Sequence, residues 1–190
     1  MFRKEIEIKL KIDDAERAME EIEKMGGIRE KDLFFEDNLL FDYRDLSLQE
    51  KGIVLRIREY AGECTLTMKK KEKRDEGSAY KIRSEIETRV SDSQTLIAIL
   101  KSLNLKAVYR YQKYRAEYLW GNLHVSIDRT PIGDFIELEG SEEEIDSAAR
   151  SLGFSKADYI NVSYRTFHLA YLRERGLPAS DLLFPEGTRK

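Results

Sequence analysis

Acidic and basic side chains alternate with apolar ones in the first twelve residues of the chain. Glu5, Glu7, Lys9 and Lys11 hold every second position, and apolar residues fill the positions between them. Because successive side chains of a β-strand point to opposite faces, this pattern predicts a strand with one charged face and one apolar face. Carboxylates bind hard divalent cations and lysine binds phosphate oxygens, so the charged face suits a ligand made of metal and phosphate.

The same division recurs in most of the later strand candidates. In these strands the charged side chains again occupy alternate positions, here called the charged parity, and they include both acids and bases. They are Arg56, Arg58, Lys69, Lys81, Arg83, Glu85, Glu87, Arg89, Lys113, Arg115, Glu117, Asp128, Glu137 and Glu139. Alternation with a period of two is typical of a sheet that buries one face. The charged faces of these strands must therefore meet.

The alternation predicts eight strands. They lie near residues 3–12, 35–43, 53–60, 63–71, 79–90, 108–119, 122–130 and 134–140. Eight strands are a suitable number for closure, so we predict an α+β fold built on a closed antiparallel eight-stranded β-barrel with helices packed outside. The charged parity then points into the lumen. That lumen must hold water or a ligand, because an empty dry lumen would leave its charges desolvated.

Helical spacing of apolar residues predicts the elements that cover the apolar face of the barrel. It occurs in four stretches, at residues 14–25, 92–103, 142–152 and 158–175. Gly26 and Gly27 stop the first stretch, and Ser141 with Glu144 has the spacing of a capping box before the third. The last stretch is predicted to dock on the outside of the sheet.

The charged parity has a second interpretation, in which the charges form a structural ion network or face solvent on an open sheet. For any single pair this interpretation is the better one. Buried ion pairs stabilise poorly, however, and a lumen lined with acids and bases on most strands would carry a large desolvation cost. A polyphosphate with a divalent metal would remove this cost, because arginine and lysine bind phosphate oxygens and carboxylates bind the bridging cation.

Composition limits the function classes. The 190 residues suit a single domain, and 33 basic against 36 acidic side chains give a net charge of −3, which argues against a general nucleic-acid or membrane surface. Cys64 is the lone cysteine, and no signal peptide or apolar run of membrane length is present, so we expect a cytoplasmic protein. The high charged fraction fits a thermophile's ion-pair-rich surface and an ordinary mesophile protein equally well.

Two further segments are interpreted by their own composition. The charge block at residues 69–77 fits a solvated loop between two strands, and its alternative is a mobile basic lid at the mouth of an anion site. The tail at residues 176–190 is predicted to lie outside the core, anchored through Leu182, Leu183 and Phe184.

The order of the charged blocks resembles the CYTH superfamily, also called triphosphate tunnel metalloenzymes. The run from Glu5 to Lys9 resembles the ExExK signature of that family, and further blocks follow in family order over about residues 3–172. They are Leu55-Arg56-Ile57-Arg58, Leu66-Thr67-Met68-Lys69, Arg83-Ser84-Glu85-Ile86-Glu87, Lys113-Tyr114-Arg115, Ile127-Asp128, Gly133-Asp134-Phe135-Ile136-Glu137-Leu138-Glu139 and Ser163-Tyr164. The chain departs from the family pattern at Met68 and at residues 165–168, which bears on the nucleotide end of the tunnel. The resemblance implies a tunnel domain at residues 1–175, followed by a C-terminal tail.

The resemblance also implies roles for the charged residues. Those that match the family's metal-holding positions, for Mg²⁺ or Mn²⁺, are Glu5, Glu7, Glu85, Glu87, Asp128, Glu137 and Glu139. Those that match its phosphate-binding positions are Lys9, Arg56, Arg58, Lys69, Lys113 and Arg115. Lys11 and Arg83 are added as substrate-binding residues, and the residues expected to be catalytic are Lys9, Arg56, Arg58 and Lys113.

Three functions remain open. The blocks look most like class IV adenylyl cyclases, in which the ribose 3′ oxygen of ATP attacks the α-phosphate and gives cyclic AMP and pyrophosphate. The alternative is a triphosphatase in which water attacks the terminal phosphate of tripolyphosphate, thiamine triphosphate or a nucleotide. A non-catalytic polyphosphate-binding module is less favoured, because carboxylates repel phosphate unless a bridging ion or catalysis requires them.

The expected partner is the triphosphate substrate, and no nucleic acid or membrane partner is expected. Phosphoryl transfer is mainly positioning and charge neutralisation, so the chemistry requires no covalent nucleophile. His124 and His168 are accordingly interpreted as packing or solvated residues. A monomer and a homodimer both remain possible.

Overall fold

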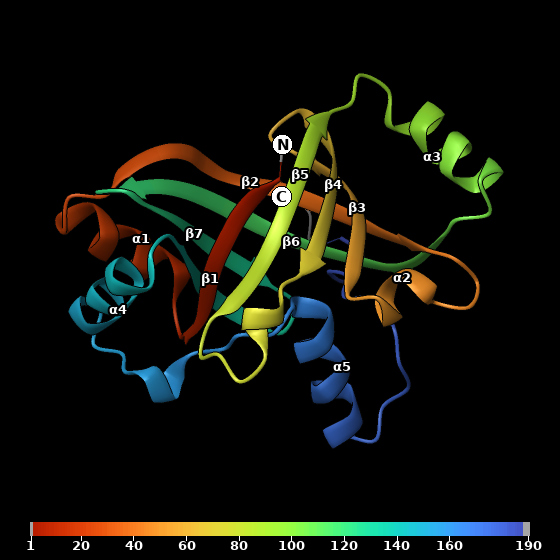
Figure 1. Ribbon diagram of the computed structural model, residues 1–190. Coiled ribbons are helices and arrows are strands. Elements are labelled where there is room, and N and C mark those ends of the chain that lie inside the picture. The colour runs from red at the N-terminus through yellow and green to blue at the C-terminus, as the bar shows by residue number, and fades with distance from the viewer. Residues whose placement is uncertain (1, 188–190) are drawn as a thin grey trace.

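A computed structural model describes residues 2–187 of the protein, apart from the side chain of residue 75. In this part of the chain, eight antiparallel strands close into a barrel in the order β1-β5-β4-β3-β2-β6-β7-β8 (Figure 1). The strands are β1 Arg3–Ile12, β2 Ile28–Asp42, β3 Ile53–Tyr60, β4 Glu63–Lys71, β5 Lys81–Arg89, β6 Lys106–Trp120, β7 Leu123–Thr130 and β8 Gly133–Glu139. The predicted α+β fold with a closed barrel is confirmed.

Strand register brings acid beside base on the inner face of the barrel. β1 closes the barrel between β5 and β8, where Glu5 lies opposite Arg83 and Lys9 lies opposite Glu137. Residues that lie opposite one another on neighbouring strands share a face of the sheet. The other parity of β1 faces outward, and its Ile8 and Leu10 are fully buried in the core under the helices.

The helices cover the outer apolar parity and close one end of the barrel. They are α1 Ala15–Lys24, α2 Ser47–Glu50, α3 Ser93–Ser102, α4 Glu142–Ser151 and α5 Tyr164–Glu174. Figure 1 shows α1 and α4 next to each other against one side of the barrel, and α3 toward the opposite side. The predicted capping box is present at the start of α4, between Ser141 and Glu144. Among the described residues, none of the helices has the length and apolar character needed to cross a membrane.

β2 is longer than the alternation predicted, because it begins at Ile28 rather than near residue 35. Its pairing with β6 shifts register between Arg29 and Lys31 and again between Lys31 and Phe34. A bulge breaks the regular alternation of side chains between the two faces. The first half of this strand therefore lacks the pattern by which the other strands were predicted.

The last helix departs from its prediction in both extent and position. It begins at Tyr164 rather than at residue 158, and Ile160 before it forms backbone hydrogen bonds with Lys9. Instead of docking outside the sheet, it directs Tyr164 inward, where the Tyr164 hydroxyl donates a 2.7 Å hydrogen bond to Asp128. Tyr164 packs with Phe135 and Tyr111, so this aromatic cluster fills one end of the barrel.

The C-terminal tail adds to the core, although it was predicted to lie outside it. Leu182 is only 2% exposed, and its backbone hydrogen-bonds to Arg110 and Gln112 of β6. Leu183 is 38% exposed, whereas Phe184 contacts the Tyr114 ring. The predicted anchor is thus found at Leu182 and Phe184, and Leu183 takes little part in it.

The charge block that begins at Lys69 runs from β4 into a short connecting loop. β4 extends to Lys71, and Lys69 itself points into the barrel. In the loop, Arg74 forms a 2.9 Å ion pair with Glu142 at the start of α4. The first part of the block therefore belongs to β4, and the rest is a surface loop held to α4 by an ion pair. The described contacts do not support a mobile lid.

Candidate active site

A cavity of about 1320 Å³ occupies the inside of the barrel. Most of the residues predicted to form a site line it, and they come from six strands. They are Glu5, Glu7, Lys9, Arg56, Arg58, Lys69, Arg83, Glu85, Glu87, Lys113, Arg115, Glu137 and Glu139. The barrel therefore brings together side chains that lie more than a hundred residues apart in the sequence.

Two of the predicted site residues lie outside the lining of this cavity. Lys11 is exposed at the end of β1, where it lies opposite Phe135 in the register. Asp128 is fully buried, and it accepts hydrogen bonds from Lys113 at 2.8 Å, from Arg115 at 2.7 Å and from Tyr164. A carboxylate already engaged by three donors is suited to positioning those side chains.

Glu5, Glu7 and Glu139 form a trio of carboxylates on the cavity wall. One oxygen of each lies within 4.8 Å of an oxygen of the other two. Glu5 Oε2 is buried and has no hydrogen-bond partner among the described residues. Burial and the negative charge of Glu5 raise the pKa of Glu139 to about 7. Crowded carboxylates with an unsatisfied oxygen are the donor set of a hard divalent cation, so these residues fit Mg²⁺ or Mn²⁺.

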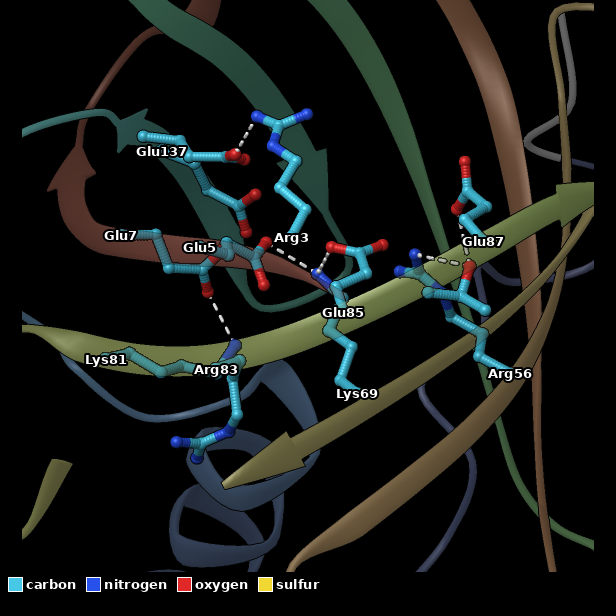
Figure 2. Close-up of polar contacts among 12 residues, drawn as sticks. Arg3, Glu5, Glu7, Arg56, Lys69, Lys81, Arg83, Glu85, Glu87 and Glu137 are labelled. Carbon is cyan, nitrogen blue, oxygen red and sulfur yellow. Dashed lines mark hydrogen bonds and ion pairs between the residues drawn. The ribbon is translucent and has the colours of Figure 1, made fainter. Parts of the chain in front are cut away.

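Lysines surround the trio and approach it from three different strands. Figure 2 shows Lys69 beside Glu5 and Lys81 beside Glu7, each at 2.5 Å. Lys9 lies 2.9 Å from Glu7 and also 3.1 Å from Glu137. Burial alone would raise the pKa of Glu7, but the neighbouring ammonium groups hold that pKa well below its usual range. The cavity thus places cations directly beside the carboxylates.

Two arginines of β3 form another part of the wall. Arg56 donates to the Tyr111 hydroxyl at 3.2 Å, and its buried Nε has no partner among the described residues. Arg58 pairs with Glu87 at 3.2 Å, and Glu87 also accepts from Thr67 at 2.5 Å. Arginine presents its donors in a planar fork that matches phosphate oxygens, so this wall is suited to binding phosphate.

The aromatic cluster also supports cations at the closed end of the lumen. The Tyr164 ring lies 5.1 Å from Lys9 Nζ and 4.9 Å from Lys113 Nζ. Arg115 reaches both Asp128 and Glu137. A cation over an aromatic face is stabilised by the ring, so Tyr164 holds two of the predicted phosphate-binding lysines in place.

Three residues of this region were missed as site residues. Glu36 is fully buried behind the wall, Lys81 contacts Glu7, and Tyr164 contacts Asp128. Lys81 shares the charged parity of β5, and Glu36 shares an inward parity with Asn38, so alternation could have found both. The inward turn of Tyr164 left no signal in the alternation, although Ser163-Tyr164 is among the blocks that resemble the family.

A closed antiparallel barrel with carboxylates and phosphate-matching cations along its lumen defines the class of triphosphate-tunnel proteins. The CYTH domain family model matches residues 3–164, and the chain belongs to this family. It is also 34% identical, over 173 residues, to the Methanocaldococcus jannaschii protein named "Putative adenylate cyclase MJ0240". That alignment covers 84% of this chain and 95% of the relative.

Solved structures share the fold of this chain at lower sequence identity. A Vibrio parahaemolyticus protein described as a "putative adenylate cyclase" is 17% identical with a TM-score of 0.78, covering 89% of this chain and 99% of its own. The Hippeastrum protein HpAC1, described as a "putative adenylyl cyclase" with a dominant triphosphatase activity, is 19% identical with a TM-score of 0.60. The match to HpAC1 covers 94% of this chain and 98% of that protein. At these identities the likeness shows the fold alone.

Proposed function

We propose that the protein is a metal-dependent enzyme that acts on the triphosphate group of its substrate. One observation carries this proposal: the carboxylate trio and basic side chains contact each other inside one cavity. The ion pair between Lys69 and Glu5 is an example. A triphosphate with a divalent cation complements both signs of charge. A ligand of one sign would leave the other set of buried charges uncompensated.

The side chains of the lumen divide into two roles under this proposal. Those proposed to bind phosphate oxygens are Lys9, Arg56, Arg58, Lys69, Arg83, Lys113 and Arg115. Glu5, Glu7 and Glu139 would hold Mg²⁺ or Mn²⁺, which when bound neutralises phosphate charge and lowers the pKa of the attacking oxygen. The remaining carboxylates, Glu85, Glu87 and Glu137, pair with these cations and become available to metal once phosphate takes their partners.

The proposed reaction is the conversion of ATP to cyclic AMP and pyrophosphate. The ribose 3′ oxygen forms a bond to the α-phosphorus, and the bond from that phosphorus to the oxygen shared with the β-phosphorus breaks. Pyrophosphate leaves, and the hydroxyl proton is released to solvent. Lys9, Arg56, Arg58 and Lys113 would offset the charge that develops on the phosphates. The similarity to the relative named "Putative adenylate cyclase MJ0240" supports this choice.

A triphosphatase is the alternative, and the cation distribution favours it. Cations from β1, β3, β4 and β6 surround the lumen, so a bare tripolyphosphate would find partners without any nucleoside. In this reaction water attacks the terminal phosphorus, the bond from that phosphorus to the bridging oxygen breaks, and the products are orthophosphate and the remaining diphosphate. The triphosphatase activity stated for HpAC1, which has the same fold, supports keeping this alternative.

Phosphorus NMR of the purified protein distinguishes these functions. ATP, tripolyphosphate and thiamine triphosphate are supplied separately with Mg²⁺ or Mn²⁺, and Glu5→Gln serves as the control for contaminating activity. Cyclic AMP with pyrophosphate identifies the cyclase, whereas orthophosphate identifies the triphosphatase. Binding without turnover of any of the three would instead support the polyphosphate-binding module.

A further inference from the structure

Glu36 is a buried carboxylate directly behind the wall of the cavity. It lies on β2, fully buried, whereas Arg56, Arg58, Lys113 and Arg115 all line the cavity itself. In the strand register Glu36 lies opposite Lys113 of β6. A negative charge is thus placed behind the part of the lumen that offers cations to phosphate.

The charges around Glu36 keep it ionised. Lys113 Nζ lies 3.5 Å from its Oε1, and Arg115 Nε lies 3.8 Å from its Oε2. Burial alone would raise the pKa of Glu36, but positive charges, first those of Lys113 and Arg115 and then those of the β3 arginines, lower it to about 2. The side chain therefore carries its negative charge throughout the neutral pH range.

This carboxylate lies near the cations without accepting their hydrogen bonds. Its Oε1 accepts a hydrogen bond from Asn38 Nδ2 at 2.9 Å, and no donor in the described part of the chain bonds to its Oε2. Lys113 and Arg115 donate to Asp128 instead. Because Coulombic attraction needs no hydrogen bond, Glu36 lowers the positive potential of the lumen and leaves the donors of the cations to other acceptors.

We propose that Glu36 is a positioning residue that acts through Lys113, Arg115 and the β3 arginines, as a fixed counter-charge that limits how tightly the lumen holds phosphate. This inference rests on the proposed function, because it takes a polyphosphate to occupy the lumen. The counter-charge weakens the binding of substrate, transition state and product alike. Uniform weakening of this kind favours product release without changing the chemical step.

Binding of tripolyphosphate in metal-depleted buffer, measured by isothermal titration calorimetry, tests this proposal. The proposed reaction requires metal, so turnover does not disturb the measurement. Glu36→Gln removes the charge with little change of shape, and we expect the Kd to fall about tenfold. Asp37→Asn is the matched control, because Asp37 lies next along β2 and pairs with Arg110 outside the cavity. Its Kd should equal that of the wild type.

The sign of the change separates this role from a purely structural one. A carboxylate that only holds the cations in place would weaken binding when it is replaced. An equal or larger Kd in Glu36→Gln therefore overturns the inference, provided that the wild type binds. If the wild type does not bind in this buffer, the titrations are repeated with Mg²⁺. Failure of the wild type to bind tripolyphosphate in both conditions would overturn the proposed function, and the inference with it.

A second variant keeps the inference testable if Glu36→Gln does not fold. Asn38→Asp places another carboxylate beside Glu36, opposite Arg58 in the register. Added negative charge at this position should raise the Kd for tripolyphosphate about tenfold. An unchanged or smaller Kd would contradict the counter-charge role.

Discussion

At the scale of single residues, the carboxylate trio is the arrangement that most needs a ligand. Glu5 is 3% exposed, and its pKa is raised by burial and by the charge of Glu7, although Lys69 partly offsets both. Its Oε2 remains without a hydrogen bond in the described structure. A buried acceptor without a partner costs about 1–3 kcal/mol, so a bound cation would relieve a penalty already present in the fold.

Glu5→Gln should reduce metal-dependent turnover about 100-fold or more while the barrel stays folded. The amide has nearly the same shape as the carboxylate but offers a cation one neutral oxygen. Turnover of ATP and tripolyphosphate is measured at saturating Mg²⁺, and circular dichroism checks the fold. Glu63→Gln is the control, because Glu63 lies on the exposed start of β4 and pairs with Arg89. Near-wild-type turnover in Glu5→Gln would refute the metal role.

Glu139 gives the metal-free protein a predictable pH dependence. Its pKa rises from the model-compound value of 4.5 to about 7 on folding, so the folded protein binds this proton more tightly than the unfolded chain does. The stabilisation is complete below pH 4.5 and is lost as the pH rises through 7. In metal-depleted buffer, Glu139→Gln should therefore gain stability relative to wild type between pH 5 and pH 8, by about 2 kcal/mol.

Urea unfolding at the two pH values measures this difference. Burial lowers the pKa of His168, but His168 is present in both proteins, so its contribution cancels in the comparison. The same stability difference at pH 5 and pH 8 would show that the pKa of Glu139 is not raised.

At the scale of elements, α5 and the tail after it hold the aromatic end of the lumen in place. Tyr164 begins α5 and touches Asp128, while Leu182 of the tail packs in the same apolar cluster. The tail also continues the barrel wall along β6, beside Arg110 and Gln112. The position over Tyr164 of the lysines proposed to bind phosphate thus depends on a segment far from them in the sequence.

Leu182→Ala should destabilise the protein by about 2–4 kcal/mol, because it leaves a cavity among packed aromatic rings. Leu183→Ala is the matched control, since it removes the same atoms from a side chain that is 38% exposed. Its effect should stay within about 0.5 kcal/mol. Chemical denaturation of both variants measures the difference, and equal effects would show that the tail does not support the core.

The elements also show how far the sequence could predict this structure. β1 was predicted at residues 3–12 and is found there, because one apolar and one charged face leave a clean period of two. The same parity rule placed the lumen residues of six strands correctly. It failed for the first half of β2, where register shifts on either side of Lys31 disturb the alternation.

The remaining errors concern contacts between elements, which parity does not encode. Asp128 has the charged parity of β7 but is enclosed by Lys113, Arg115 and Tyr164 instead of facing the cavity. That outcome depends on α5 entering the end of the barrel. An amphipathic pattern in α5 predicts that a helix buries one side, and does not determine which element covers that side.

At the scale of the whole molecule, the barrel walls carry charges of both signs, which a ligand of mixed charge would complement. Cations from several strands line the lumen, and their acidic neighbours compensate them in part. A ligand that binds the folded state but not the unfolded state stabilises the protein. The gain in free energy of unfolding grows with the logarithm of the ligand concentration divided by the Kd. Thermal unfolding with different phosphates therefore reports which part of a substrate the lumen recognises.

Tripolyphosphate with Mg²⁺ should raise the Tm, corresponding to about 2.7 kcal/mol at a hundredfold excess over the Kd. ATP with Mg²⁺ should also raise it, because both ligands present three phosphates to the same arginines and lysines. AMP at equal concentration should leave the Tm unchanged, since one phosphate cannot span cations that lie on several strands. Differential scanning fluorimetry provides the comparison, with Arg58→Ala as a variant whose shift should shrink. Stabilisation by AMP equal to that by tripolyphosphate would mean that the charged lumen is a structural ion network rather than a triphosphate site.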